Sequence, residues 1–270
     1  MLTFPNAKIN IGLNITEKRP DGYHNLETIF YPIDLCDTLE FVEEKETKFT
    51  CSGLNIEGES DNNLIIKAYK LLKEEFDLPT INIHLHKAIP MGAGLGGGSA
   101  DAAFMLKMLN NEFQLNLTTQ ELEQKAAKLG ADCAFFINNK PTLAKGIGNL
   151  FEPTCINLSR YHIVLVKPEV HVSTAEAYGG CKPQRWTTPL EEAIKRPITE
   201  WKECIFNDFE KTVFIAHPEL ANIKELLYEK GAIYAAMSGS GSTIYGIFDK
   251  EIEQNITTDT KSDIYYLTLK

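Results

Sequence analysis

Five glycines lie within the seven positions from Gly92 to Gly98, between an alternating strand pattern and an alanine-rich helix pattern. Glycine loses more backbone entropy on folding than any other residue, so a run of this density needs a reason. Without Cβ atoms, main-chain N–H groups can approach an anion closely, and the positive end of the following helix adds to the attraction. A flexible linker is the alternative, but a linker is not expected between such a strand and such a helix. The run therefore predicts a cradle for a chain of phosphates.

Several nucleotide-binding loops contain glycines at this density. Gly92, Gly94 and Gly97 satisfy the G-x-G-x-x-G pattern, which by itself is a weak signal. A Rossmann site would also need an acidic residue after a second strand about 20 residues on, where residues 116–118 enter another helix. A Walker A loop would need Gly-Lys-Ser/Thr, and a protein kinase would need H-R-D and D-F-G strings. None of these strings occurs, so the three classes are disfavoured.

The glycine run becomes specific when two other strings are considered with it. The string P-M-G-A-G-L-G-G-G-S-A resembles the phosphate loop of the GHMP kinases, and P-N-A-K-I-N-I-G-L resembles their first motif. S-G-S-G-S at 238–242 resembles their third motif, a turn that supports the loop. The resemblance implies loop support from Gly239, Ser240 and Gly241. It implies ATP binding by Pro90, Met91, Gly92, Ala93, Gly94, Leu95, Gly96, Gly97, Gly98, Ser99 and Ala100.

A longer N-terminal block narrows the resemblance to one family. A-K-I-N-I-G-L-N-I, followed by R-P-D-G-Y-H-N-L-E-T, resembles the 4-diphosphocytidyl-2-C-methyl-D-erythritol kinases of non-mevalonate isoprenoid precursor biosynthesis. N-L-I at 63–65, L-G-A-D at 129–132 and N-D-F-E at 207–210 also resemble that family. The similarity spans the chain, although residues 180–206 match little. Cys133 and Ala134 stand where the family is expected to have valine or proline.

The resemblance implies the reaction and its catalytic pair. The γ-phosphoryl group of ATP passes to the 2-hydroxyl of the methylerythritol moiety, with Asp132 as the base and Lys8 as its partner. Asp132 precedes the apolar run 134–137 and would be desolvated there unless a cation compensated it. It would accept the hydroxyl proton, while Lys8 keeps it ionised and steadies the developing oxyanion. A strand lysine is otherwise most often exposed, so the flanking motif carries this assignment.

The same resemblance assigns substrate contacts. Tyr23 stacks on the cytosine, His24 reads the edge of the base, and Tyr178 is a second stacking ring. Asn10 contacts the diphosphate or the erythritol, and Lys87 lies near the adenine or ribose of ATP. The alternative for Tyr23 and His24 is a turn with an aromatic anchor.

Phosphoryl transfer also calls for Mg²⁺ between the β- and γ-phosphates. The motifs assign no carboxylate to this ion. Ser99 with water molecules could suffice, because Mg²⁺ usually keeps several waters.

Hydrophobic periodicity predicts a mixture of strands and helices without strict alternation, and therefore an α+β fold. We expect two lobes, an ATP-binding and catalytic lobe over 1–155 and a second lobe over 156–270. The resemblance implies the two-lobed GHMP kinase fold, with a first lobe like ribosomal protein S5 domain 2 and a ferredoxin-like second lobe. The predicted strands are 7–15, 27–35, 37–42, 81–86, 162–166, 233–237, 243–248 and 264–269, and the predicted helices are 63–76, 100–109, 118–130, 173–178 and 218–231.

Composition limits the classes of protein that are possible. The 270 residues are 43% hydrophobic and 24% charged, which is typical of a globular protein. The net charge of −10 lacks the basic footprint of a nucleic-acid or anionic-membrane binder. We find no apolar run long enough to span a membrane, no secretory signal and no paired cysteine motif among six cysteines. We therefore expect a cytoplasmic protein that acts on a small molecule. Its expected state is a monomer or weak homodimer, which composition does not decide.

Two alternatives remain open at this point. Another GHMP kinase, of the homoserine or mevalonate type, would share the glycine loop but lack the G-Y-H string. A non-catalytic nucleotide-binding module is disfavoured because Lys8, Asp132 and the loop are all present.

Overall fold

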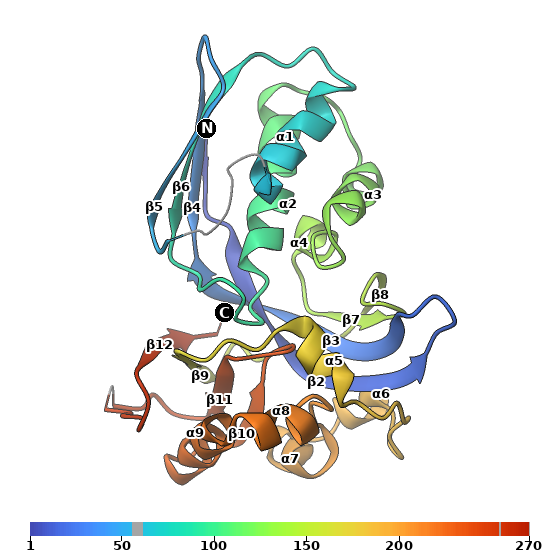
Figure 1. Ribbon diagram of the computed structural model, residues 1–270, viewed down its shortest axis with the longest axis vertical. Coiled ribbons are helices and arrows are strands. Elements are labelled where there is room, and N and C mark those ends of the chain that lie inside the picture. Colours follow the sequence, from blue (N-terminus) through green and yellow to red (C-terminus); the bar gives the residue numbers. More distant parts are fainter. Residues whose placement is uncertain (56–61, 254, 270) are drawn as a thin grey trace. The chain divides into compact units, whose positions relative to one another are not determined.

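The computed structural model describes residues 1–55, 62–253 and 255–269 (Figure 1). The chain forms two compact units that interleave in the sequence. The boundary predicted between 155 and 156 stays a prediction. The first unit comprises Met1–Ala7, Leu35–Met91 and Gly96–Lys140, and the second comprises Lys8–Asp34, Gly92–Leu95 and Pro141–Lys270.

The first unit contains a mixed sheet, which has four strands among the described residues, in the order β1-β4-β6-β5. β4 runs antiparallel to β1 and β6, whereas β5 runs parallel to β6. Ile81, Ile83 and Leu85 form the buried face of β6, which confirms the alternation expected there. The strands are β1 (Leu2–Thr3), β4 (Thr38–Glu43), β5 (Lys48–Gly53) and β6 (Ile81–Lys87).

Helix α2 lies among the other helices of the first unit and contacts all three of them. The side chain of Asn63 caps α1, and Thr118 with Glu121 forms the capping box expected at the start of α3. Helix α2 begins three residues before its predicted start, so Ser99 lies in its first turn and Gly96 is the N-cap. The helices are α1 (Leu64–Lys73), α2 (Gly97–Glu112), α3 (Thr119–Leu129) and α4 (Phe135–Asn138).

The described residues of the second unit carry two sheets. One has the order β2-β3-β7-β8, and its first two strands extend beyond both predicted ends. Its strands are β2 (Asn6–Lys18), β3 (His24–Cys36), β7 (Thr142–Lys145) and β8 (Leu150–Pro153). The other sheet has the order β10-β11-β9-β12 and is antiparallel throughout its described strands. Its strands are β9 (His162–Pro168), β10 (Tyr234–Met237), β11 (Ile244–Phe248) and β12 (Ser262–Thr268).

The second of these sheets has a ferredoxin-like strand order. Numbered along the chain, its strands lie in the order 2-3-1-4, which read from the other edge is 4-1-3-2. Helix α9 packs on β10 and β11, and apolar residues from these elements share one core. The described residues between β11 and β12 form no helix, so the second helix of that motif is missing there.

Two helices of the second unit, α5 and α9, are predicted by their caps, and one of these caps differs in part. Pro218 occupies the first turn of α9, and the hydroxyl of Ser173 accepts from the N–H of Glu176 at the start of α5. The second half of the expected capping box differs, because the carboxylate of Glu176 lies 2.8 Å from Nε2 of His217. The helices are α5 (Thr174–Gly179), α6 (Leu190–Ala193), the 3₁₀ helix η2 (Ile198–Glu200), α7 (Trp201–Cys204), α8 (Glu210–Ala216) and α9 (Pro218–Glu229).

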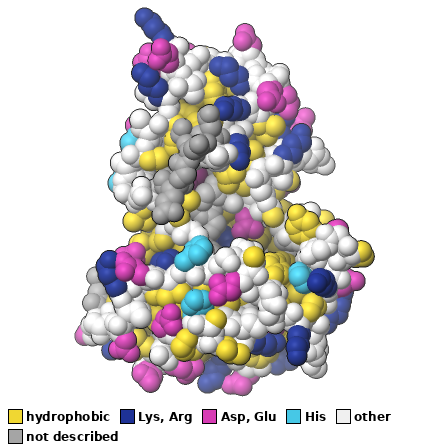
Figure 2. All heavy atoms as spheres, in the orientation of Figure 1, with side chains coloured by type: hydrophobic (Ala, Val, Ile, Leu, Met, Phe, Trp, Pro, Cys, Tyr) yellow, Lys and Arg dark blue, Asp and Glu magenta, His cyan; other side chains and the backbone are white. Residues whose placement is uncertain are grey.

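The surface carries charges of both signs. On the face drawn in Figure 2, Lys and Arg side chains are interspersed with Asp and Glu among the described residues. No helix within the described ranges is both long and apolar enough to cross a membrane. All six cysteines carry free thiols.

Candidate active site

The predicted phosphate loop has a backbone that depends on glycine. Gly92, Gly94 and Gly96 have φ angles of 59°, 76° and 72°, a region that L side chains rarely adopt. A Cβ atom at Gly94 would lie 1.9 Å from the main-chain oxygen of Ser238, so that position admits glycine alone. A Cβ atom at Gly98 would meet no atom within 4 Å. The first turn of α2 therefore presents open space, in which a bound group could approach its main chain.

The other loop residues divide into a packed set and an accessible set. Met91 is exposed, and Ser99 is half-buried at the third position of α2. At Gly97, a Cβ atom would meet Ile89 at 2.9 Å, so α2 packs tightly against the end of the preceding segment. The buried members of the loop are Pro90, Ala93, Leu95, Gly97 and Ala100.

The turn at 238–242 contacts the loop within the second unit. The hydroxyl of Ser238 donates to the main-chain oxygen of Gly94 at 2.8 Å, and the N–H of Thr243 donates to Ala93 at 3.3 Å. The two donors, Ser238 and Thr243, lie on either side of the predicted support residues Gly239, Ser240 and Gly241. A Cβ atom at Gly239 would lie 3.5 Å from Cα of Gly94, so this glycine also allows the close approach.

Lys8 is buried, unlike an ordinary strand lysine. Its ammonium group donates to Oδ1 of Asn10 at 2.5 Å and to the main-chain oxygen of Gly94 at 3.0 Å. The ring centroid of Phe30 lies 5.0 Å from the same Nζ atom. Its main-chain N–H donates to Leu95. Within the second unit, the loop residues 92–95 and the predicted catalytic lysine are therefore directly linked.

Asp132 belongs to the first unit, in the turn between α3 and α4, and is half-buried. The neighbouring Cys133 is fully buried, and burial raises the pKa of its thiol to about 11, with a hydrogen bond to Ser99 opposing the rise. Since thiolates are the reactive form, Cys133 is an inert thiol at neutral pH. The catalytic role predicted for Asp132 stays a prediction.

Lys87 lies in a buried cluster of charged side chains. Its ammonium group is fully buried and pairs with carboxylates of Asp37 and Asp101, the latter at 2.8 Å. Asp37 also accepts from the main-chain N–H groups of Ala88 and Ile89. Burial makes separation of the Lys87 ammonium group from these two partners costly, and its predicted place near the adenine or ribose of ATP stays a prediction. Through Asp101, Lys87 ties the end of β6 to the second turn of α2.

The aromatic residues expected around cytosine are only partly brought together. The rings of His24 and Tyr178 are stacked with centroids 4.9 Å apart and planes at 22°. The rings of Tyr178 and Phe209 pack edge to face, with centroids 4.8 Å apart and planes at 79°. Tyr23 is 63% exposed, in the turn before β3, where its N–H donates to Asp21. This exposed ring is free to meet a planar partner.

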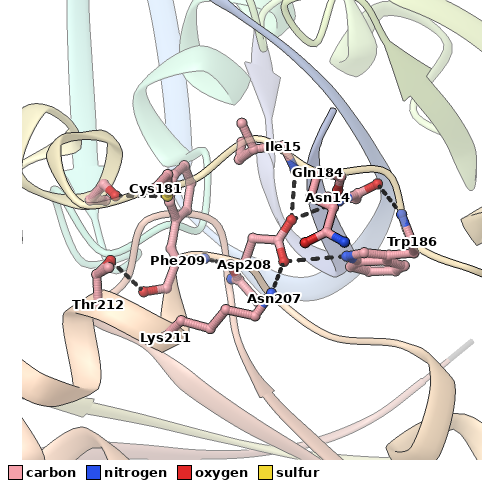
Figure 3. A network of polar contacts seen from close by, with 11 residues as sticks. Asn14, Ile15, Cys181, Gln184, Trp186, Asn207, Asp208, Phe209, Lys211 and Thr212 are labelled. Atoms are coloured by element: carbon pink, nitrogen blue, oxygen red, sulfur yellow. Dashed lines mark hydrogen bonds and ion pairs between the residues drawn. The ribbon is translucent and has the colours of Figure 1, made fainter. Parts of the chain in front are cut away.

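The N-D-F-E string organises the second unit around buried polar groups (Figure 3). Oδ2 of Asp208 accepts from Asn14 at 2.7 Å and from the N–H of Ile15 at 2.8 Å, and its Oδ1 accepts from the indole of Trp186 at 3.2 Å. The amide of Asn207 donates to the main-chain oxygens of residues 237 and 239, both at 2.8 Å. These contacts join β2, the segment at 184–186 and the turn that supports the loop.

Two family descriptions match the chain. "GHMP kinases N terminal domain" covers residues 63–140 and "GHMP kinases C terminal" covers residues 190–259. A 4-diphosphocytidyl-2-C-methyl-D-erythritol kinase of Bacteroides fragilis is 61% identical over 255 residues, which are 93% of each chain. The chain belongs to this family of GHMP kinases. The corresponding kinase of Cytophaga hutchinsonii is 52% identical over 94% of each chain.

Solved structures agree with this membership. A crystal structure of a 4-(cytidine 5'-diphospho)-2C-methyl-D-erythritol kinase superposes with a TM-score of 0.80 at 30% identity, over 92% of this chain and 90% of that one. A mevalonate kinase of Methanococcus jannaschii superposes with a TM-score of 0.72 at 15% identity, over 100% and 98% of the two chains. At that identity the second match shows the fold alone. The α+β, two-lobed GHMP kinase fold predicted from the sequence is confirmed.

Proposed function

We propose that this kinase transfers the γ-phosphoryl group of ATP to the 2-hydroxyl group of 4-diphosphocytidyl-2-C-methyl-D-erythritol. The observation that carries the proposal is the 61% identity, over 93% of both chains, with a relative that bears this kinase's name. The reaction makes a bond between the hydroxyl oxygen and the γ-phosphorus, and it breaks the bond between that phosphorus and the oxygen shared with the β-phosphate. The products are the 2-phosphate and ADP.

Asp132 and Lys8 would carry the proton and the charge in this step. The carboxylate of Asp132 takes the proton of the attacking hydroxyl as the new bond forms. Lys8 holds a fixed cation near residues 92–95, since its ammonium group is bonded to the main chain of Gly94. A fixed cation stabilises the charge that develops on the oxygens of the transferred group.

The phosphate chain of ATP would lie along the glycine loop. Main-chain N–H groups and the N-terminal end of α2 attract anions without any basic side chain. The open space at Gly98 and the exposure of Gly92 support this position. An acidic protein of net charge −10 needs such a local device to hold a polyanion.

Mg²⁺ would accompany ATP and neutralise part of its charge. The described residues contain no cluster of three His, Cys, Asp or Glu side chains that could hold a metal. This suits an ion that keeps several waters and is carried by phosphates. The half-buried hydroxyl of Ser99, in the first turn of α2, is the ligand that we propose from this chain.

The cytidine moiety would bind at the aromatic residues of the second unit. Tyr23 supplies an exposed ring for stacking, and His24 supplies ring nitrogens for the polar edge of the base. Tyr178 already stacks with His24, so cytosine would either extend this stack or replace one of its contacts. The amide of Asn10 is buried and bonded to Lys8 and Thr28, so its predicted contact with the diphosphate or the erythritol would use the remaining N–H of its NH₂ group.

A side-by-side phosphorylation assay tests the proposal. The purified kinase is given ATP and Mg²⁺ with the cytidyl substrate, mevalonate or homoserine, and the phosphorylated position is read by ³¹P NMR. We expect turnover with the cytidyl substrate alone. Preferential turnover of mevalonate or homoserine would assign the chain to another GHMP activity, and nucleotide binding without turnover of any acceptor would indicate a non-catalytic module.

We further propose that the reaction takes place in the cytoplasm, where the six free thiols would stay reduced. We propose a monomer or weak homodimer as the acting species. Sedimentation velocity over a range of concentrations measures the assembly state, and a stable larger assembly would contradict this proposal.

A further inference from the structure

A continuous chain of buried polar groups leads from β3 to the ammonium group of Lys8. Thr28, Asn10 and Lys8 are exposed by 1%, 4% and 3%, and all three belong to the second unit. Nδ2 of Asn10 donates to Oγ1 of Thr28 at 2.9 Å, and Oδ1 of Asn10 accepts from Lys8 at 2.5 Å. The motifs assign no role to Thr28.

The hydroxyl of Thr28 has a fixed direction. Its single proton is donated to the main-chain oxygen of Gly12 at 2.6 Å, and a carbonyl oxygen can only accept. Towards Asn10 the hydroxyl can therefore only accept a hydrogen bond. The direction of this hydroxyl is set by the backbone of β2.

This direction determines which end of the Asn10 amide faces Lys8. The NH₂ group must face Thr28, which leaves the carbonyl oxygen facing the ammonium group. If the amide were reversed, two donors would face each other at Lys8 and two acceptors at Thr28. Burial makes either mismatch costly, because water cannot replace the lost partner.

A second hydroxyl group holds another acceptor of Lys8, the main-chain oxygen of Gly94. The proton of Ser238 is donated to the main-chain oxygen of Gly94 at 2.8 Å, and its oxygen accepts from the N–H of Asn10 at 3.1 Å. Asn10 and Gly94, two acceptors of the ammonium group, are thus each bonded to a hydroxyl group, and a main-chain oxygen accepts the proton of that hydroxyl. The position of the Lys8 cation depends on these buried groups.

We propose that Thr28 is a positioning residue of the phosphoryl-transfer step, which orients the Asn10 amide and through it the ammonium group of Lys8. The inference rests on the proposed function, in which Lys8 stabilises the transferred charge. A misplacement of about 1 Å in a catalytic group can lower a rate by about 100-fold. Thr28 therefore acts on kcat rather than on the binding of either substrate.

The test compares hydroxyl-free and hydroxyl-bearing variants of the full-length kinase. Thr28→Val keeps the shape of the side chain and removes the hydroxyl, while Thr28→Ser keeps the hydroxyl. We expect Thr28→Val to lower kcat by about 10- to 100-fold with both KM values changed less than about twofold. We expect Thr28→Ser to restore most of kcat. If Thr28→Val does not fold, as judged by urea unfolding, Thr28→Ala replaces it.

Thr212→Val is the matched control. It removes a hydroxyl of the same unit that donates to the main-chain oxygen of Phe209 at 3.2 Å (Figure 3) and that has no part in the Thr28–Asn10–Lys8 chain. We expect kcat of Thr212→Val to equal that of the unchanged kinase. A loss of kcat in this control equal to that of Thr28→Val would attribute the effect to general destabilisation and overturn the proposal.

A double-mutant cycle decides whether Thr28 acts through Asn10. On an Asn10→Ala background, Thr28→Val should cause no further loss of kcat, because the intermediate group is gone. An undiminished loss on that background would overturn the proposal, as would near-normal kcat in Thr28→Val alone. The variant Lys8→Met distinguishes the proposed role of Lys8 from the proposed role of Thr28. Normal turnover in Lys8→Met would remove the proposed role of Lys8 and the Thr28 proposal with it, whereas an inactive Lys8→Met with a fully active Thr28→Val would overturn the Thr28 proposal alone.

Discussion

Replacing Asp101 by asparagine should change how the stability of this kinase depends on pH. The Asp101 side chain is 3% exposed, with Oδ2 at 2.8 Å from the ammonium group of Lys87. Oδ1 has no hydrogen-bond partner among the described residues. Burial raises the pKa of Asp101 from 3.8 to about 7, with Lys87 opposing the rise and Asp37 adding to it. The folded protein therefore retains a proton that the unfolded chain releases.

The size of the effect follows from this difference in pKa. A rise from 3.8 to about 7 corresponds to about 4 kcal/mol, at about 1.36 kcal/mol per unit of pKa. Because the folded state binds the extra proton between these two values, the free energy of unfolding falls as the pH rises through that window. About 2–3 kcal/mol of this fall lies between about pH 5 and 8. Asp101→Asn carries no titrating proton, so it should not show this contribution.

Urea unfolding at about pH 5, 6, 7 and 8 measures the prediction. The free energy of unfolding of Asp101→Asn, relative to the unchanged kinase, should rise by about 2–3 kcal/mol across this range. Glu112→Gln is the matched control, since it makes the same carboxyl-to-amide change at an exposed position of α2. Its curve should run parallel to that of the unchanged kinase. A parallel curve for Asp101→Asn as well would show that Asp101 is ionised throughout, and the reasoning from burial would be refuted.

Gly94→Ala should lower the free energy of unfolding by more than about 3 kcal/mol, because it combines a φ of 76° with a Cβ atom 1.9 Å from a carbonyl oxygen. Gly98→Ala is the matched control and should raise the free energy of unfolding by about 0.5–1 kcal/mol, since its Cβ meets no atom within 4 Å. Equal effects of the two variants in chemical denaturation would contradict the argument from packing at Gly94. Asp132→Asn should lower kcat by about 10²- to 10⁴-fold with little change in KM, and near-normal single-turnover rates would leave Asp132 a structural residue. Tyr23→Ala should raise KM for the cytidyl substrate by the loss of about 1–3 kcal/mol of stacking and spare KM for ATP. Steady-state kinetics in both substrates checks this, and a change on the ATP side alone would place the ring at the other substrate.

The local elements of this kinase follow from short-range chemistry in the sequence. Alternation in β6, the Asn63 cap of α1 and the Thr118–Glu121 capping box depend on residues within a few positions of one another. Short-range chemistry places the start of α2 too late. Glycine has a low helix propensity, so the sequence predicts the helix only from Ala100, whereas α2 begins at Gly97. Packing of Gly97 against Ile89 supports the extra turn, and no local pattern reports that contact.

The sequence also predicts only part of the site's chemistry. The glycine-rich string and the block around Lys8 identify the family, because main-chain phosphate binding requires particular residue types at adjacent positions. The surroundings of the charged groups could not be predicted so well. The motifs place Lys87 near the adenine or ribose of ATP, but they do not indicate that residues 50 positions before it and 14 positions after it supply the two acidic side chains that pair with its ammonium group.

The sequence by itself determined the fold class, the family and the type of loop, since each depends on residue patterns that are contiguous along the chain. Only the tertiary structure decided which polar groups lie together. Thr28 reaches Lys8 through Asn10 because adjacent strands bring them side by side, and Ser238 reaches Gly94 across 144 positions. The direction of a hydroxyl, the polarity of an amide and the pKa of a buried carboxyl depend on such distant partners. No spacing of residue types along the chain encodes them, because they arise only when burial removes water as an alternative partner.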